Sequence, residues 1–287
     1  MLWLFFAFFT ALFESTKDIF SKKSLKNIDE YITSWSLRSF SLFFLLPLLF
    51  FIKIPALGSQ FWVALLVSGS LNVVATVLYM KAIKNSDLSI TVPMVTFTPL
   101  FLLMTSPLIV GEFPSHLGLA GVLLIVLGSY TLNIKQRHEG YLAPFRALFK
   151  EQGPRLMLLV AIIWSVSSNF DKIGVQNSAP IFWVIATNIF MTLMLLPIML
   201  LRSKNSFSQI ASNYKALLPI GLFSALTLIC QMTAISLALV AYVISVKRIS
   251  VVLSVLLGWI IFKEKNIKER LVGAAIMVAG VILITLS

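Results

Sequence analysis

The sequence is poor in charged residues. Asp, Glu, Lys and Arg together make up 12% of the 287 residues, whereas a soluble domain typically has about a quarter of its residues charged. Hydrophobic residues account for 59% of the chain, and the mean hydropathy is +0.95. Such a chain cannot cover its surface with charged side chains, so most of that surface must face something other than water. An ordinary soluble domain is therefore excluded.

Cysteine and histidine are scarce as well. Cys230 is the one cysteine, so an internal disulfide is impossible, and its apolar surroundings are typical of a small buried side chain. The two histidines, His116 and His138, lie in polar connections. Neither HExxH nor GxSxG occurs, and no carboxylate pair has a histidine nearby. We therefore expect no metal site, no cofactor and no enzymatic activity.

The few charges are mostly of one sign, with 23 Lys and Arg against 11 Asp and Glu, for a formal net charge of +12. The basic residues are scattered between apolar runs and form no domain-sized patch, which argues against nucleic acid as a partner. Membrane proteins concentrate Lys and Arg in the loops on one side of the bilayer. We interpret the excess charge as a signal of membrane topology.

Apolar runs fill most of the chain. A hydrocarbon core of about 30 Å needs about 20 apolar residues in a helix, because backbone groups in lipid must be hydrogen-bonded within their own segment. Ten runs meet this requirement, at about Leu2–Phe20, Tyr31–Ile52, Phe61–Ala82, Leu88–Val110, Leu117–Leu132, Arg155–Gly174, Pro180–Leu201, Leu217–Ala238, Val240–Phe262 and Leu271–Leu286. The sequence predicts an all-α, multi-pass protein of the cell membrane (the inner or plasma membrane).

Two stretches depart from this pattern. The fourth run carries Pro93, Pro99 and Pro107. Proline bends or breaks a helix, which is tolerated where the helix lines a cavity, although membrane helices carry more proline in general. Residues 133–154 form a polar linker, predicted either as a solvated connection or as a short amphipathic helix on the membrane surface.

The two halves of the chain resemble each other at an offset of about 152 residues. The matching residues follow the same order: Met80, Ala82, Ile83, Glu112, Gly121 and Gly128 correspond to Met232, Ala234, Ile235, Glu264, Gly273 and Gly280. Five helices are an odd number, so the second half must start on the opposite side of the membrane. We predict two inverted five-helix repeats, residues 1–132 and 155–287, around a central cavity, as in many secondary transporters.

The basic residues also predict an orientation. Most of them fall in connections that follow odd-numbered runs, whereas Lys53 and Lys172 are assigned to even connections. The positive-inside rule then places the odd connections in the cytoplasm and both termini outside. Asp171 and Lys172, at the end of the sixth run, are expected at the membrane interface.

The stretch Tyr242–Ile284 reads YVISVKRISVVLSVLLGWIIFKEKNIKERLVGAAIMVAGVILI. It resembles the end of an EamA-type transporter of the drug/metabolite transporter superfamily, with Glu264 at a tight turn before a helix spaced by Gly273 and Gly280. The run AIIWSVSSNFDKIGV from Ala161 resembles the start of a family repeat. The resemblance implies ten helices in two inverted repeats, a central cavity and a transport function. Many members are thought to keep both termini in the cytoplasm, which opposes the orientation predicted from charge.

Several ionisable residues fall inside the apolar runs, where each costs a few kcal/mol and usually faces a bundle interior. They are Glu14, Lys17, Asp18, Arg38, Lys247 and Arg248. Because Lys and Arg bind carboxylate and phosphate, we predict that Lys17, Arg38, Lys247 and Arg248, together with Tyr242, bind the substrate. The Lys247–Arg248 pair also resembles the lysine–arginine pair with which sugar-phosphate transporters, another branch of the superfamily, hold phosphate.

The acidic residues leave alternatives open. Glu14 and Asp18 either couple transport to protons or neutralise the cations by pairing with Lys247, Arg248 or Arg38. Arg38 could also reach the interface by snorkelling. Core packing is the alternative for Tyr79, Trp164 and Tyr242.

The sequence favours a secondary transporter of a small polar metabolite (an organic anion, an amino acid or a related compound) that works by alternating access. A flippase for lipid head groups or lipid-linked sugars is the alternative on the same fold. The expected partners are this small molecule and the lipid bilayer, and both a monomer and a homodimer are compatible with the sequence.

Overall fold

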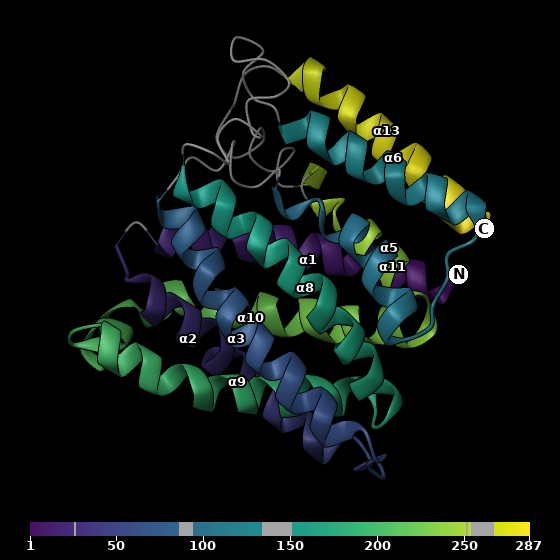
Figure 1. Ribbon diagram of the computed structural model, residues 1–287. Coiled ribbons are helices and arrows are strands. Elements are labelled where there is room, and N and C mark those ends of the chain that lie inside the picture. Colours follow the sequence, from purple (N-terminus) through teal and green to yellow (C-terminus); the bar gives the residue numbers. More distant parts are fainter. Residues whose placement is uncertain (26, 86–93, 134–150, 251, 254–266) are drawn as a thin grey trace.

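The computed structural model describes residues 1–25, 27–85, 94–133, 151–250, 252–253 and 267–287, and every regular element in these residues is helical (Figure 1). The first half contains α1 (Leu2–Ser24), α2 (Glu30–Leu45) continued by the short 3-10 helix η1 (Leu46–Phe50), α3 (Phe61–Asn85), α5 (Thr98–Ile109) and α6 (His116–Asn133). The second half contains α8 (Gln152–Gln176), α9 (Pro180–Arg202), α10 (Ser206–Leu237), α11 (Val240–Lys247) and α13 (Ile267–Thr285). The predicted all-α fold class is confirmed.

Among the described residues, five helical stretches are long and apolar enough to cross a membrane: Glu30–Phe50, Phe61–Lys84, Gln152–Gln176, Pro180–Arg202 and Ser206–Leu237. Shorter apolar helices lie at Thr98–Ile109, His116–Thr131 and Val272–Thr285. Helix α1 also has 23 residues, but Glu14, Lys17 and Asp18 interrupt its apolar run. The count of ten crossings stays a prediction.

Some predicted boundaries were wrong. Helix α10 starts at Ser206 rather than at Leu217. The residues between them mix polar and apolar side chains and contain neither glycine nor proline, so the helix extends beyond its continuous apolar part. Helix α8 starts at Gln152, inside the predicted linker, with Pro154 in its first turn where proline is tolerated. The rest of the predicted surface helix, residues 134–150, lies outside the described residues.

The glycine pairs noted in the sequence form the contact between α6 and α13, which lie side by side in Figure 1. A Cβ atom on Gly121 would lie 2.6 Å from the carbonyl oxygen of Gly280, and one on Gly128 would lie 2.6 Å from that of Gly273. Only glycine allows backbones to approach this closely. Because the earlier glycine of one helix faces the later glycine of the other, α6 and α13 run antiparallel.

Two other pairs of helices, which come from corresponding runs of the two halves, are also antiparallel. Ser203, which follows α9, donates a 2.5 Å hydrogen bond to Asp29, which precedes α2. Glu112, which follows α5, accepts a 2.8 Å hydrogen bond from the backbone N–H of Val240, the first residue of α11. The first contact joins the end of α9 to the start of its counterpart α2. The second joins the end of the fourth predicted run, which contains α5, to the start of the corresponding ninth run, which contains α11. This is the geometry that an inverted repeat requires.

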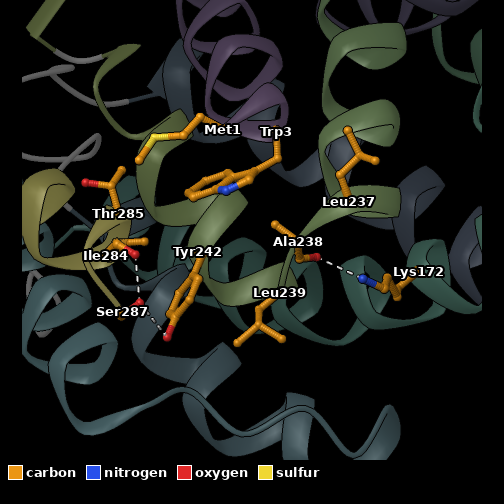
Figure 2. Close-up of a pocket in the computed structure, with 10 residues that line it drawn as sticks. All are labelled: Met1, Trp3, Lys172, Leu237, Ala238, Leu239, Tyr242, Ile284, Thr285 and Ser287. Carbon is orange, nitrogen blue, oxygen red and sulfur yellow. Dashed lines mark hydrogen bonds between the residues drawn. The ribbon is translucent and has the colours of Figure 1, made fainter.

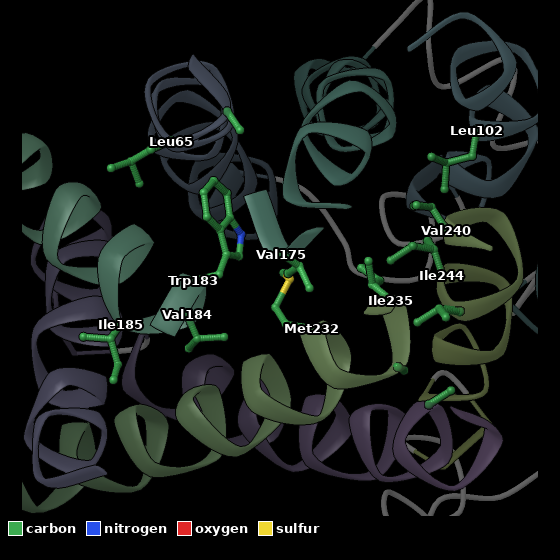
Figure 3. Close-up of a cluster of buried hydrophobic side chains, with 14 of the residues drawn as sticks. Leu65, Leu102, Val175, Trp183, Val184, Ile185, Met232, Ile235, Val240 and Ile244 are labelled. Atoms are coloured by element: carbon green, nitrogen blue, oxygen red, sulfur yellow. The ribbon is translucent and has the colours of Figure 1, made fainter. Parts of the chain in front are cut away.

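Both halves contribute to the largest cluster of buried apolar side chains (Figure 3). It includes Leu65 and Leu102 from the first half, and Trp183, Met232 and Ile244 from the second. Trp183 is fully buried, and its ring packs edge-on against Phe61 with 5.6 Å between the ring centroids. The cluster therefore packs the two halves together along the interface where the polar cavity described next is found.

Candidate functional site

A cavity of about 100 Å³ lies between the two halves of the chain. Helices α1, α2, α3, α8, α9, α10 and α11 and the first residue of α5 contribute side chains to its wall. Its charged lining residues are Glu14, Lys17, Arg38, Asp171, Lys247 and Arg248. Four described cations thus face two described carboxylates, so the cavity attracts anions. In the rest of the text, this is the central cavity.

An ion network joins α1 to α11 across the central cavity. The ammonium of Lys17 lies 2.8 Å from the Glu14 carboxylate and 3.5 Å from that of Asp18. Lys247, from the other half, lies 3.4 Å from Glu14 and donates a 2.9 Å hydrogen bond to Gln231 on α10. The predicted pairing of Glu14 with Lys247 is therefore present.

The two arginines have spare hydrogen-bonding capacity. Arg38 and Arg248 each have a buried Nε atom with no hydrogen-bond partner among the described residues, and both line the central cavity. A guanidinium group has five N–H donors and is always charged, and an unpaired donor away from water is unfavourable. These two groups are therefore suited to receive an anion from outside the chain. Arg38 lies in the wall of the central cavity.

Arg248 owes its position to a break in the backbone helix. Helix α11 ends at Lys247, residues Arg248 and Ile249 form a turn, and the helical conformation resumes at Ser250. At the offset of 152 residues, this turn corresponds to Thr96 and Phe97, which form a turn just before α5. The fourth run is thus broken just before α5, which has Pro99 in its first turn. The break lies beside the cavity, because the adjacent residue Thr98 lines the cavity wall.

Asp171, which we expected at the membrane interface, is buried among the helices. Its side chain lines the central cavity and is 6% exposed. Two donors hold it, the hydroxyl of Ser68 at 2.5 Å and the indole N–H of Trp183 at 3.1 Å, both on Oδ1. Helix α8 continues to Gln176, so Asp171 lies more than a turn before its end.

Several uncharged lining residues complete the cavity. Tyr79 and Trp164 contribute aromatic rings whose centroids are 5.4 Å apart. Asn72 and Gln231 contribute amides, which the sequence analysis missed. The signal was available, because an amide inside an apolar run is as exceptional as a charge.

Tyr242, which we predicted to bind the substrate, is not among the residues that line the central cavity. Its ring lines a second pocket near the chain termini, with its centroid 6.5 Å from that of Trp3 (Figure 2). Its hydroxyl accepts a 3.2 Å hydrogen bond from the backbone N–H of Ser115 and lies 3.3 Å from the hydroxyl of Ser287. The other predicted binding residues, Lys17, Arg38, Lys247 and Arg248, do meet around the central cavity.

Lys172 was assigned to a connection between helices, but it lies inside α8 and is 6% exposed. Its ammonium lies 3.0 Å from the Glu112 carboxylate. It also donates hydrogen bonds of 2.7 and 2.8 Å to the carbonyl oxygens of Ile235 and Ala238, at the end of α10. A second lysine–glutamate pair thus links the halves outside the central cavity.

The profile of the EamA-like transporter family matches residues 1–134 and again residues 152–286. This chain belongs to the EamA-like transporter family. The family is part of the drug/metabolite transporter superfamily, and its members are transporters rather than enzymes. The resemblance drawn from the sequence is confirmed, and the protein is a multi-pass membrane transporter with two EamA repeats.

One solved structure, described as "Crystal structure of protein", superposes on this EamA protein with a TM-score of 0.77. The alignment covers 99% of this chain and 96% of the other, at 16% sequence identity. That level of identity speaks for the shared fold alone. No curated protein matches the chain.

Proposed function

We propose that this EamA-family protein is a secondary transporter of a small organic anion or zwitterion, such as a carboxylate, a phosphate ester or an amino acid. The observation that carries the proposal is the pair of buried arginine Nε donors, on Arg38 and Arg248, that line the central cavity without a partner among the described residues. Arginine binds carboxylate and phosphate through parallel N–H donors. An anion in the cavity would find an unpartnered guanidinium donor on each half of the protein.

The lysines complete the binding site in this proposal. Lys17 and Lys247 both contact Glu14, so in the absence of substrate their charges are neutralised inside the protein. An unpaired buried charge costs several kcal/mol, and this arrangement avoids that cost. When an anion binds, Lys247 turns from Glu14 to the substrate, while Lys17 keeps Glu14 and Asp18 paired. Glu14 and Asp18 then serve as charge partners or as proton carriers.

The proposed architecture is ten transmembrane helices in two inverted repeats, residues 1–132 and 155–287, joined by the polar segment 133–154. The antiparallel pairs α2/α9, α5/α11 and α6/α13 support this inversion. Alternating access follows from two similar bundles that rock around a site at their interface. We propose the cell membrane, inner or plasma, as the location.

Binding and transport can be tested on purified protein. A thermal-shift screen against carboxylates, phosphate esters and amino acids should find ligands that raise the unfolding temperature, because a ligand at 100 times its Kd adds about 2.7 kcal/mol of stability. The hits are then tested for uptake into proteoliposomes. Lipid scrambling measured in the same vesicles distinguishes the transporter from a head-group flippase.

The matched variants are Lys247→Ala with Arg248→Ala, compared with Lys84→Ala. Lys84 forms an ion pair with Glu30 outside the central cavity. The double variant should remain folded in the membrane and lose both ligand stabilisation and uptake, while Lys84→Ala keeps both. Uptake at the wild-type rate in the folded double variant would remove the pair from the mechanism.

A further inference from the structure

A second pocket of about 500 Å³ lies at the end of the molecule where both termini are found (Figures 1 and 2). Its described lining residues come from the start of α1, from α8, from the α10–α11 junction and from the end of α13: Met1, Trp3, Lys172, Leu237, Ala238, Leu239, Tyr242, Ile284, Thr285 and Ser287. Aromatic and aliphatic side chains make up most of the wall, and Lys172 supplies its charged side chain.

The second pocket and the central cavity follow one another along the same four helices. On α8 the adjacent residues Asp171 and Lys172 belong to the central cavity and to the second pocket, respectively. On α11, Tyr242 lines the second pocket, whereas Ile244 and Lys247 line the cavity. Helices α1 and α10 likewise contribute to both. The two spaces are therefore consecutive along one direction through the protein.

A thin apolar barrier separates them. Along α1, α10 and α11, the residues between the two linings include Ala7, Ile235 and Val243, which have no solvent exposure and belong to the large apolar cluster. On α10, the distance from Leu237 in the second pocket to Met232 in the cavity wall is about 7.5 Å along the helix, at 1.5 Å per residue. A short apolar constriction of this kind is enough to exclude water and ions, because water does not stay between closely spaced apolar side chains.

The ion pair Glu112–Lys172 holds this barrier together. The Glu112 carboxylate uses one oxygen for Lys172 at 3.0 Å and the other for the backbone N–H of Val240 at 2.8 Å. Lys172 in turn binds the two carbonyl oxygens of Ile235 and Ala238. One ion pair thus caps the end of α10 and the start of α11. Glu112 belongs to the first half, whereas its two partners, Lys172 and Val240, belong to the second half.

We infer that the second pocket is the vestibule through which the substrate anion enters or leaves the central cavity, and that the Glu112–Lys172 ion pair is its gate. The inference rests on the proposed function for the identity of the anion. An anion in the second pocket meets the ammonium of Lys172 and competes with Glu112 for it. When Glu112 leaves, Val240 loses its hydrogen bond to the first half, and one polar restraint on α11, which carries Lys247 to the cavity wall, is released.

The gate is tested by chemical labelling without any substrate. In a Cys230→Ser background, Ser224→Cys reports on the central cavity and Leu237→Cys reports on the second pocket. Proteoliposomes are treated with the membrane-impermeant anion 2-sulfonatoethyl methanethiosulfonate. Labelling of Leu237→Cys gives the fraction of protein whose second pocket faces the reagent. The labelling rate of Ser224→Cys, measured for the fraction of protein whose second pocket faces the reagent, reports how often the barrier opens.

Glu112→Gln should raise the labelling rate of Ser224→Cys about tenfold or more, because a buried ion pair no longer closes the barrier. Lys172→Gln, which keeps a donor for the α10 carbonyls, should have the same effect and serves if Glu112→Gln does not fold. Glu30→Gln is the control, since it removes an ion pair to Lys84 outside both spaces. Unchanged labelling in either folded gate variant, or an equal rise in Glu30→Gln, overturns the gate.

The vestibule role has its own readout, the ratio of labelling of Leu237→Cys by the anionic reagent to labelling by its cationic trimethylammonium analogue. Glu112→Gln leaves the Lys172 charge unneutralised and should raise this ratio severalfold, whereas Lys172→Gln should lower it. Equal ratios in the two variants overturn the vestibule. If the ratios and rates behave as expected but no anion binds the purified protein, the proposed function fails and the gate stands.

Discussion

Among the described residues, two lysine–glutamate pairs connect the halves of this protein, and they differ in how completely their members are bound. At the gate, Lys172 has three partners, and both oxygens of Glu112 are used. In the central cavity, Lys247 lies 3.4 Å from Glu14 and has one further partner, Gln231. Glu14 meanwhile keeps Lys17 at 2.8 Å. The Glu112–Lys172 pair holds the end of α10 next to the start of α11. In the central cavity, Lys247 can leave Glu14 without leaving that carboxylate unpaired, because Lys17 remains.

The largest expected effect comes from breaking the gate pair. Lys172→Met leaves the Glu112 carboxylate buried without its cation and two α10 carbonyl oxygens without their donor. The free energy of unfolding should fall by about 3–5 kcal/mol, measured by unfolding of the purified protein in denaturant. A loss no larger than that of Lys247→Met would contradict the comparison.

Lys247→Met should have a smaller effect on stability and a larger one on binding. Because Glu14 keeps Lys17 as its partner, the free energy of unfolding should fall by less than about 2 kcal/mol. The stabilisation by carboxylate or phosphate ligands in a thermal-shift assay should nevertheless disappear. Lys172→Gln provides the matched test, because it should retain ligand stabilisation in the central cavity.

Gln231→Leu sharpens the comparison from within the cavity. It removes the acceptor of the 2.9 Å hydrogen bond from Lys247, which should lower the free energy of unfolding by about 1 kcal/mol. Thr233→Val on the same helix is the control, since the Thr233 hydroxyl bonds to the backbone of its own helix and lies outside the central cavity. A gain in stability for Gln231→Leu would show that the hydrogen bond contributes nothing in the absence of ligand.

The smallest effect is expected at the exposed pair Glu30–Lys84, where the lysine side chain is 43% exposed. Surface ion pairs contribute about 0–1 kcal/mol because water competes for both charges. Glu30→Gln should therefore change the free energy of unfolding by no more than about 1 kcal/mol. A loss as large as that of Lys172→Met would mean that burial does not distinguish the pairs.

The corresponding turns of the two halves share a backbone conformation but carry different side chains. Both halves break a helix at the same place, at Thr96–Phe97 and at Arg248–Ile249. The second half carries Lys247 and Arg248 there, where the first half carries Val95 and Thr96. The repeat thus supplies a common backbone, and the two cations at this turn come from the second copy.

Much of this could be predicted from the sequence. Apolar runs specify the helices because a backbone in lipid has to satisfy its own hydrogen bonds. Gly121 and Gly128 were recognised in the sequence as a pair that recurs at Gly273 and Gly280, although the close contact between the two pairs was seen only in the structure. The charges inside apolar runs identified the four cations described in the cavity wall. A charge in such a run is costly to bury, so it usually faces the interior of the helix bundle.

Other features were beyond the sequence. We predicted that Tyr242 belongs to the substrate site, but its ring lines the second pocket. The sequence does not indicate which of two spaces an aromatic ring enters. Lys172 and Asp171 are adjacent, yet one holds a gate and the other lines the cavity, because neighbouring residues on a helix point about 100° apart. Their assignment depends on which helices pack on each side.

The sequence by itself determined the helical membrane fold, the two-copy organisation and the need to neutralise a few buried charges, because these follow from local composition and from its repetition. Tertiary structure alone decided which charges pair. Glu14 and Lys247 are far apart in the chain, as are Glu112 and Lys172, and their distances depend on how the two halves pack. The difference between an exchangeable pair and a gate is therefore a property of packing.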